Sequence, residues 1–163
     1  MVMLQANLFN VEEETTTSST TGDLYATQIT GDLGELEFDK FCTQNNISYY
    51  KSSSGAAPID RIIITDSDKT IKIHVKASVE MLHSSRNLPY WQFNTQESPK
   101  TADYYFCVGL AKHTREKEFI LWVPHEIGKH KRFQCSTKNM WKYSEFLKIP
   151  NEIIDATNIL QFE

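Results

Sequence analysis

The segment from Asp60 to Lys76 holds the residues best suited to chemistry. Asp60 opens a run of β-forming residues, DRIIIT, and a second run, TIKIHVKA, carries His74 and Lys76 near its end. Side chains alternate along a strand, so His74 and Lys76 share one face while Ile73 and Val75 share the other. A carboxylate, an imidazole and an ammonium group on one surface can together hold a cation and a phosphate.

The hairpin brings these groups together only in certain registers. Directly opposed residues of an antiparallel pair point to the same face. Asp60 therefore shares the face of His74 only if paired residue numbers add to an even value. A tight two-residue turn would pair Asp66 with Lys69 and send Asp60 to the other side. We therefore expect a loop of three or four residues, or a bulge, between the strands.

These residue types favour a site for Mg²⁺ or Mn²⁺. Such cations prefer oxygen ligands, which the Asp60 carboxylate and the main-chain carbonyl of Val75 would supply. Lys76 would lie near the attacking water, where it lowers the pKa of that water or stabilises the charge that develops on phosphorus. Glu35, in the segment GDLGE, is the candidate for a further carboxylate, acting directly or through water.

The surrounding pattern predicts a mixed α/β domain with a sheet of about five strands. We expect a helix from Asp23 to about Gln44, with three apolar residues at helical spacing and two internal glycines: Ile29, Leu33, Leu36, Gly31 and Gly34. A glycine inside a helix costs about 1 kcal/mol relative to alanine, which indicates close approach of another backbone or of a ligand. The alternative is fraying near the start of the helix.

The strands are expected at ISYYK, DRIIIT, TIKIHVKA, YWQFN, ADYYFCVGLA and EFILWVP. The run ADYYFCVGLA is apolar on both faces and is predicted to be a central strand. Residues 79–88 are expected to be helical or irregular. A short helix start is expected at HEIG, and a helix or turn at WKYSEFLKI.

The bulk composition is typical of one soluble domain. The chain has 163 residues, of which 40% are hydrophobic and 23% charged. Residues 1–22 are predicted to be a flexible, acidic, Thr- and Ser-rich segment, and residues 23–163 a single domain. No run approaches the roughly 20 apolar residues of a membrane span. Cys42, Cys107 and Cys135 are predicted to be buried free thiols, which favours a cytoplasmic location.

The net charge of −4 hides a basic C-terminal half. Residues 112–148 hold nine Lys or Arg against four Asp or Glu. Phosphate binding depends on such local patches, because screening limits their reach to about 10 Å. The candidates for nucleic-acid contacts are Lys51, Ser53, Ser54, Lys129, Lys131, Arg132 and Lys138. The alternatives are a solvated basic surface and, for residues 51–55, a plain connecting loop.

The order of these segments resembles the PD-(D/E)XK nuclease superfamily. GDLGELEFDKF is similar to the first helix with its glutamate, PIDRIII to the strand with the metal-binding aspartate, and IKIHVKAS to the strand that ends in Glu-X-Lys or Gln-X-Lys. YWQFN, ADYYFCVGL and FILWVPHEI resemble the elements that follow, so the similarity spans residue 23 to about 130. Carried over by motif, Glu35, Asp60 and Lys76 match, and His74 departs.

The resemblance implies a restriction-endonuclease-like core and divalent-metal-dependent cleavage of DNA phosphodiester bonds, as in small bacterial and phage nucleases. Cutting both strands of a duplex needs two sites, so we expect a homodimer or a larger homo-oligomer. Two other functions stay open. One is a nucleic-acid-binding or assembly module on the same fold that cleaves weakly or not at all. The other is an α/β interaction protein that does not bind DNA.

His74 stands where the family pattern has Glu or Gln, and three interpretations of it stay open. It is a working metal ligand or a group that orients water, it marks a domain that binds nucleic acid and cleaves poorly, or it is a structural histidine. A neutral imidazole is a softer ligand than a carboxylate and would relatively favour Mn²⁺ over Mg²⁺.

Overall fold

A five-stranded mixed sheet forms the centre of the molecule. The computed structural model describes residues 18–51, 59–65, 67–95, 102–128 and 132–156, and in the first helix the side chains from Ala26 onward. The sheet has the order β1-β2-β3-β6-β7. Its strands are β1 (Tyr49–Lys51), β2 (Arg61–Ile64), β3 (Thr70–Val79), β6 (Tyr104–Leu110) and β7 (Lys117–Pro124). Strands β3 and β6 are parallel and the other pairs antiparallel, which confirms the predicted fold class.

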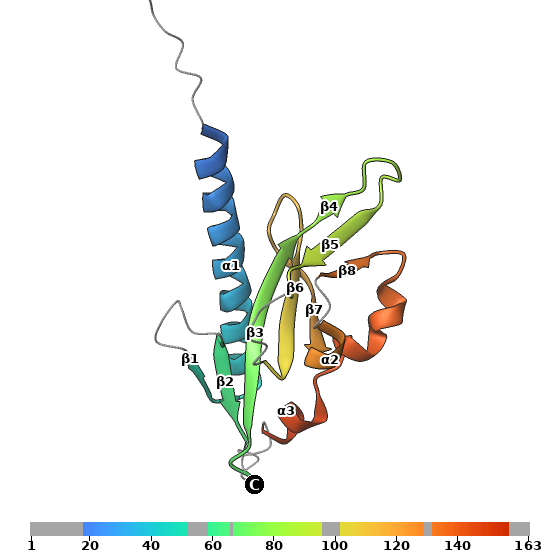
Figure 1. Ribbon diagram of the computed structural model, residues 1–163. Coiled ribbons are helices and arrows are strands. Elements are labelled where there is room, and N and C mark those ends of the chain that lie inside the picture. Colours follow the sequence, from blue (N-terminus) through green and yellow to red (C-terminus); the bar gives the residue numbers. More distant parts are fainter. Residues whose placement is uncertain (1–17, 52–58, 66, 96–101, 129–131, 157–163) are drawn as a thin grey trace, which may run out of the picture.

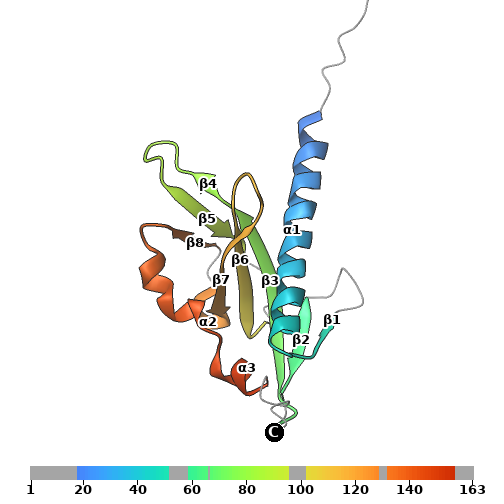
Figure 2. The same cartoon turned by 180° about the vertical axis from the view of Figure 1, so that it is seen from behind.

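The remaining elements cover the two faces of this sheet. Helix α1 (Ser18–Gln44) runs alongside β3 on one face (Figures 1 and 2). The other face carries a three-stranded sheet of order β4-β5-β8, with β4 (Met81–Leu82), β5 (Pro89–Phe93) and β8 (Phe133–Ser136). The short helices are α2 (His125–Gly128), η1 (Met140–Leu147) and α3 (Asn151–Asp155).

This second sheet corrects the sequence-based expectation. Residues 79–88 are not helical, because they form the end of β3, the two-residue strand β4 and a turn that leads into β5. Asn87 takes a positive φ of 47° in this turn, a conformation that asparagine tolerates better than most residues. Strand β8 was not expected at all, and it pairs with β5 from Tyr90↔Ser136 to Phe93↔Phe133.

The core has two parts, one on each face of the central sheet. Alternation along β6 sends Phe106 and Val108 toward α1, where they join Phe38 and Ile73. The opposite residues, Tyr105 and Cys107, pack under the second sheet with a further group: Trp91, Phe93, Leu121, Val123, Phe133 and Cys135. Both faces of β6 are therefore buried, as predicted for a central strand.

The buried side of α1 differs from the expected stripe. The helix begins at Ser18 rather than Asp23, and Leu33 packs against the core while Ile29 and Leu36 are 41% and 47% exposed. The contact line is centred on Gly34, where an added Cβ would lie 2.8 Å from the Cβ of Ala77. Close approach to β3 therefore explains this glycine.

The three cysteines are buried and unpaired, as predicted. Burial raises the pKa of the Cys42 and Cys135 thiols to about 12 and raises that of Cys107 further. Among the described residues, no helix is long and apolar enough to cross a membrane.

Candidate active site at the Asp60–Lys76 hairpin

The hairpin has the register that brings Asp60 onto the face of His74. Arg61 pairs with Ile73 and Ile64 pairs with Thr70, so paired numbers add to an even value. Beyond the strands, the Thr65 N–H donates to the main-chain oxygen of Lys69 at 2.9 Å. The connection is therefore longer than a two-residue turn, as a site shared by Asp60 and His74 requires. Asp60, directly before Arg61, falls opposite His74.

Asp60 is held by two donors from β3. The N–H of Val75 donates to Oδ2 of Asp60 at 2.8 Å, and Nδ1 of His74 lies 3.3 Å from the same oxygen. An ionised carboxylate can only accept, so the His74 Nδ1 carries the hydrogen in this contact. The side chain of Asp60 remains 33% exposed, while that of His74 is 4% exposed. The carboxylate thus faces solvent and the imidazole lies behind it.

The surroundings of Asp60 favour the ionised form of its carboxyl group. Burial is the largest single influence and favours the neutral form, but the hydrogen bonds from His74 and Val75 and the electrostatic influence of His74 and Lys76 oppose it. Their combined effect holds the pKa of Asp60 below its ordinary value of 3.8. The carboxylate is therefore negatively charged near neutral pH.

The ring of His74 is part of the packed interior. It stacks on Tyr105 at a centroid distance of 5.9 Å and an interplanar angle of 18°, and Tyr105 stacks on His125 at 6.2 Å. Nε2 of His74 is also buried. Because one ring nitrogen faces Asp60 and the other faces the interior, this geometry suits a residue that positions Asp60.

Lys76 lies two residues beyond His74 on the same face of β3, in line with Cys107 of β6. Its side chain is partly exposed, and its positive charge lowers the pKa of both Asp60 and Cys107. The structure therefore brings Asp60, His74, Val75 and Lys76 together. Asp60 lies just before β2 begins, beside the part of β3 that extends past β2 and carries the other three residues.

Glu35 does not contact Asp60 directly, because Arg61 lies between them. Nη2 of Arg61 donates to Oε2 of Glu35 at 2.9 Å, and Nη1 donates to the main-chain oxygen of Asp60 at 2.9 Å. Nε of Arg61 lies 3.6 Å from Oδ1 of Asp39. The guanidinium thus connects two carboxylates of α1 to the strand that carries Asp60.

Sequence reasoning missed Arg61, although a signal was present. Alternation places Arg61 on the buried face of β2 with Ile63, and its side chain is only 4% exposed. A buried cation needs a partner, and Glu35 and Asp39 lie four residues apart on one side of the facing helix. This pattern predicts an ion pair between α1 and β2.

The oxygen donors near Asp60 fit a hard cation that is held jointly with a substrate. In the described part of the chain, no group of three or more His, Cys, Asp or Glu side chains could hold a metal ion. Oδ1 of Asp60 makes no hydrogen bond to a described residue. The carbonyl of Val75 faces the same edge of β3 as its N–H. Mg²⁺ typically binds through one or two carboxylates together with substrate phosphates.

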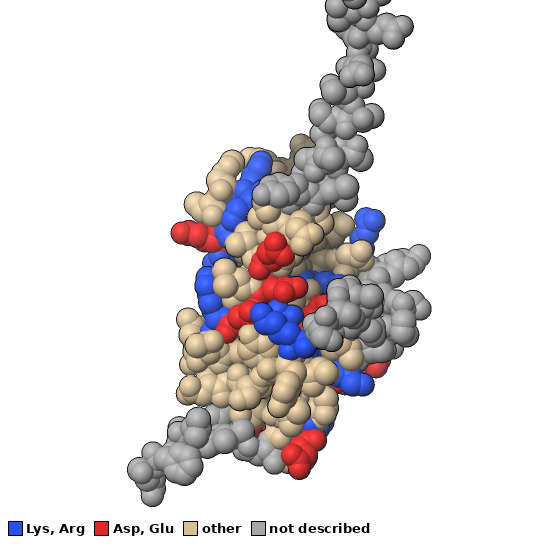
Figure 3. Space-filling view, turned by 90° about the vertical axis from the view of Figure 1, so that its left-hand side faces the viewer, with Lys and Arg blue, Asp and Glu red and all other residues tan. Residues whose placement is uncertain are grey.

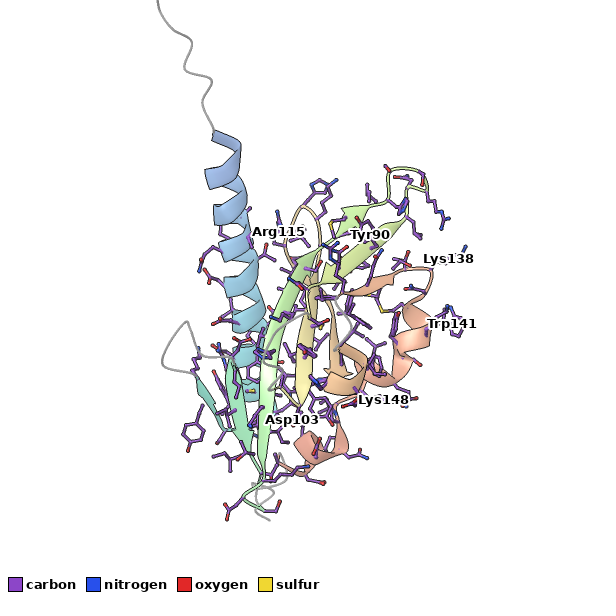
Figure 4. The ribbon with its side chains drawn as sticks, in the orientation of Figure 1. Tyr90, Asp103, Arg115, Lys138, Trp141 and Lys148 are labelled. Carbon is purple, nitrogen blue, oxygen red and sulfur yellow. The ribbon has the colours of Figure 1, made fainter. Side chains whose placement is uncertain are left out.

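A groove of about 600 Å³ lies next to this site. It is lined by small residues of α1, by β3 and by one residue of the β6–β7 turn: Ala26, Thr27, Thr30, Gly31, Val75, Lys76, Ala77, Val79 and Arg115. Figure 1 shows α1 and β3 diverging here, and Figure 4 shows Arg115 beside α1. Val75 and Lys76 line this groove, whereas Asp60 and His74 do not, and Val75 contacts Asp60 through its main-chain N–H.

The three predicted nucleic-acid contacts that the structure describes, Lys51, Arg132 and Lys138, do not form one patch. Lys51 forms an ion pair of 2.6 Å with Asp39. Figure 3 shows basic and acidic side chains intermixed on that side of the molecule. Arg132 and Lys138 are exposed, and Lys138 lies on the side away from α1 (Figure 4). The other candidates, Ser53, Ser54, Lys129 and Lys131, lie outside the described residues.

Comparison with known proteins gives one distant structural neighbour to report. No protein-family model matches the sequence, and no curated protein matches it either. The structure of a bacterial homing endonuclease, I-Ssp6803I, is similar with a TM-score of 0.49 and 10% sequence identity, over 66% of this chain and 74% of that chain. At this identity and TM-score the likeness carries no information about activity.

Proposed function

We propose that this chain is a divalent-metal-dependent endonuclease of the PD-(D/E)XK type that hydrolyses phosphodiester bonds of DNA. The observation that supports the proposal most is the arrangement around Asp60. An ionised, partly exposed carboxylate is fixed by two donors, a lysine lies two residues beyond His74 on β3, and an open groove adjoins this lysine. This set of groups suits phosphoryl transfer, where positioning and electrostatic stabilisation dominate.

The residues divide the work as follows. Val75 and His74 hold Oδ2 of Asp60, so that Oδ1 stays directed to the open side. Lys76 stabilises the negative charge that develops on the phosphate or assists the attacking water. A bound Mg²⁺ or Mn²⁺ would be held by Asp60 and the Val75 carbonyl, and it would supply charge neutralisation at the phosphate.

His74 acts in this proposal as the positioning residue of Asp60. Its buried ring leaves no nitrogen directed to solvent, so the proposal does not need it as a metal ligand. Glu35 is 51% exposed and bound to Arg61. It would join the cation directly or through water only if its carboxylate turned from Arg61 when substrate binds.

Plasmid cleavage tests the proposal. Asp60→Ala and Lys76→Ala should each lower cleavage of supercoiled plasmid in Mg²⁺ or Mn²⁺ by on the order of 10²–10³-fold or more, because each removes a charge that acts on the transition state. Circular dichroism and a gel shift in chelator would show that folding and binding persist. Asp155→Asn and Lys112→Ala remove matched exposed charges elsewhere and should cleave normally.

Two results would contradict the assignment. One is cleavage by Asp60→Ala or Lys76→Ala at the wild-type rate, which would locate the chemistry elsewhere. The other is wild-type cleavage that chelator leaves unchanged.

One observation favours a second function, a nucleic-acid-binding module without strong cleavage. Glu35 is held in an ion pair with Arg61, and the described residues contain no group of three side chains that could hold a metal ion. This function predicts a gel shift that weakens with salt and no cleavage in either metal. Isothermal titration with Mn²⁺ separates the two functions, because the module would give no heat of metal binding.

We further propose that the endonuclease acts as a homodimer or larger homo-oligomer, since cutting both strands needs two copies of the site. Sedimentation equilibrium with and without duplex DNA measures this. A monomer that nevertheless makes double-strand breaks in a single binding event would contradict it.

A further inference from the structure

Trp141 has the largest exposed fraction among the exposed large apolar side chains of the described chain. It is 72% exposed, whereas Met140, Tyr143 and Phe146 of the same segment are partly buried against the core. Tyr143 and Phe146 of the same segment stack at 6.0 Å, and Tyr143 meets Phe133 of β8 edge to face at 4.8 Å. Tyr143 and Phe146 therefore attach η1 to the rest of the molecule, and Trp141 does not take part in this packing. Figure 4 shows Trp141 pointing away from the molecule.

Two lysines, Lys142 and Lys138, lie on the same side of the molecule as this ring. Nζ of Lys142 lies 5.7 Å from the centroid of the Trp141 ring, within the range of a cation–π contact. Lys138, three residues before Trp141, is exposed and lies on the same side of the molecule as Trp141 (Figure 4). Neither lysine forms an ion pair or a side-chain hydrogen bond with a described residue. Lys148 differs, because it is bound to Glu145 at 3.1 Å.

The turn between β8 and η1 is fixed by Asn139. Its side-chain oxygen accepts a hydrogen bond from the Ser136 N–H at 2.6 Å, and its main-chain oxygen accepts one from the Lys142 N–H at 3.0 Å. Lys138 and Trp141 lie on either side of this residue. The ring and the charges are therefore presented on an ordered support, which lowers the entropy lost when a ligand binds.

We propose that Trp141 is a stacking platform for an unpaired base of nucleic acid, with Lys138 and Lys142 binding the adjoining phosphates. The inference rests on the proposed function for the identity of the polymer. Aromatic rings flanked by cations bind single strands because every base offers a π-face, and the stack forms only with a base that has left its duplex. A protein partner would match this surface only if it offered acidic groups to both lysines, whereas the phosphates of any nucleic acid supply these charges.

The position of this surface gives it a role separate from cleavage. It lies on the side away from α1, and no described contact joins it to Asp60. It would hold a single-stranded portion of the substrate, such as a frayed end or a displaced strand, while Asp60 and Lys76 act on the strand to be cut.

Intrinsic fluorescence tests the proposal directly. Trp91 and Trp122 are 4% and 2% exposed, so Trp141 is the tryptophan that iodide and a bound base can reach. In the Asp60→Ala background, which avoids turnover, a single-stranded oligonucleotide should quench this emission and protect it from iodide. The duplex of the same sequence should quench it less. Trp141→Phe should abolish the signal and keep part of the affinity.

The variants give graded effects. Trp141→Ala should weaken single-strand binding about 5- to 150-fold, the range expected when one base loses its aromatic platform. Lys138→Ala and Lys142→Ala should each lower the slope of log affinity against log salt by about 0.7. Lys148→Ala, in the same region but paired with Glu145, should change neither quantity.

Each outcome has a defined meaning. If the oligonucleotide binds but Trp141→Ala binds equally well and no quenching occurs, the platform is refuted and the proposed endonuclease stands. If Trp141→Ala loses binding but wild type never cleaves, the platform stands and the endonuclease falls. If wild type binds no nucleic acid, or if Trp141 emission changes only with protein concentration through self-association, the inference is overturned.

Discussion

α1 meets β3 in two different ways along its length. At the C-terminal end of the helix, Phe38 is fully buried and makes edge-to-face contacts with Tyr49 and Phe106 at 5.4 and 5.0 Å. At the N-terminal end, helix and strand are separated by the groove lined by Gly31 and Ala77. The closed end is held by aromatic packing, and the open end is lined mainly by small side chains.

The difference indicates how the site is positioned. The closed end fixes α1 against β2 and β3, and Arg61 ties it to the main chain of Asp60. Asp60 lies directly before the first residue of β2, beside the part of β3 that is not paired with β2. The packed half therefore supplies rigidity, and the open half supplies access.

The largest effect that would test this contrast is expected at the closed end. Phe38→Ala should lower the free energy of unfolding by about 3–5 kcal/mol, because it leaves a cavity among buried rings. Leu36→Ala, two residues away on the exposed side, should change it by about 0.5 kcal/mol or less. Urea denaturation measures both. Equal losses would mean that α1 is not packed through Phe38.

The two helical glycines give the next largest effect, with opposite signs. Gly34→Ala should lower stability by about 1–3 kcal/mol, because its Cβ would lie 2.8 Å from that of Ala77. Gly31→Ala should raise stability by up to about 1 kcal/mol, because nothing lies within 4 Å of its Cβ position. The midpoint of thermal unfolding, measured for both variants and for wild type, should fall for Gly34→Ala and rise for Gly31→Ala.

A second substitution provides the control for the glycine pair. Ala77→Gly removes the atom that Gly34→Ala would strike, so the double variant should recover part of the lost stability. A destabilising Gly31→Ala would mean that the groove is closed in solution.

The smallest effect concerns the boundary residue His74. His74→Asn keeps a donor beside Asp60, whereas His74→Leu keeps volume and removes the donor. The Leu variant should be less stable than the Asn variant by about 1 kcal/mol, the net value of one hydrogen bond. It should also raise the pKa of Asp60, measured from the side-chain carboxyl resonance in an NMR titration. An unchanged pKa in the Leu variant would refute the positioning role.

The sign of the pH dependence follows from the same contact. The folded-state pKa of Asp60 lies below its unfolded value, so ionised Asp60 stabilises the fold above pH about 4. That stabilisation is lost as the pH falls through the folded-state pKa. In His74→Leu the pKa difference is smaller, so unfolding free energy should fall less steeply with acid than in wild type.

Sequence patterns predicted the part of the molecule that depends on alternation. The faces of β3 followed from the side-chain period, and the even-numbered register was expected because a shared site requires it; together they bring Asp60, His74 and Val75 close to one another. The burial of both faces of β6 followed from its continuous apolar run. These are local properties, which one strand and one turn determine.

What the sequence did not predict depends on tertiary contacts. β4 has two residues, too few to show a strand period, and β8 depends on pairing with β5, which lies far from it in the chain. Ile29 and Leu36 match helical spacing with Leu33 but face outward, because the tightest contact is made at Gly34. The pairing of Arg61 with Glu35 likewise depends on the packing of α1 against β2.

The three buried cysteines have a practical consequence. The thiolate is the reactive form, and burial raises the pKa of Cys42 and Cys135 to about 12 and that of Cys107 further. The native chain should therefore resist alkylation and air oxidation while it is folded. A cysteine introduced at Thr30, in the groove, would be the one readily labelled position. A dye or spin label could then report directly on what enters the groove between α1 and β3.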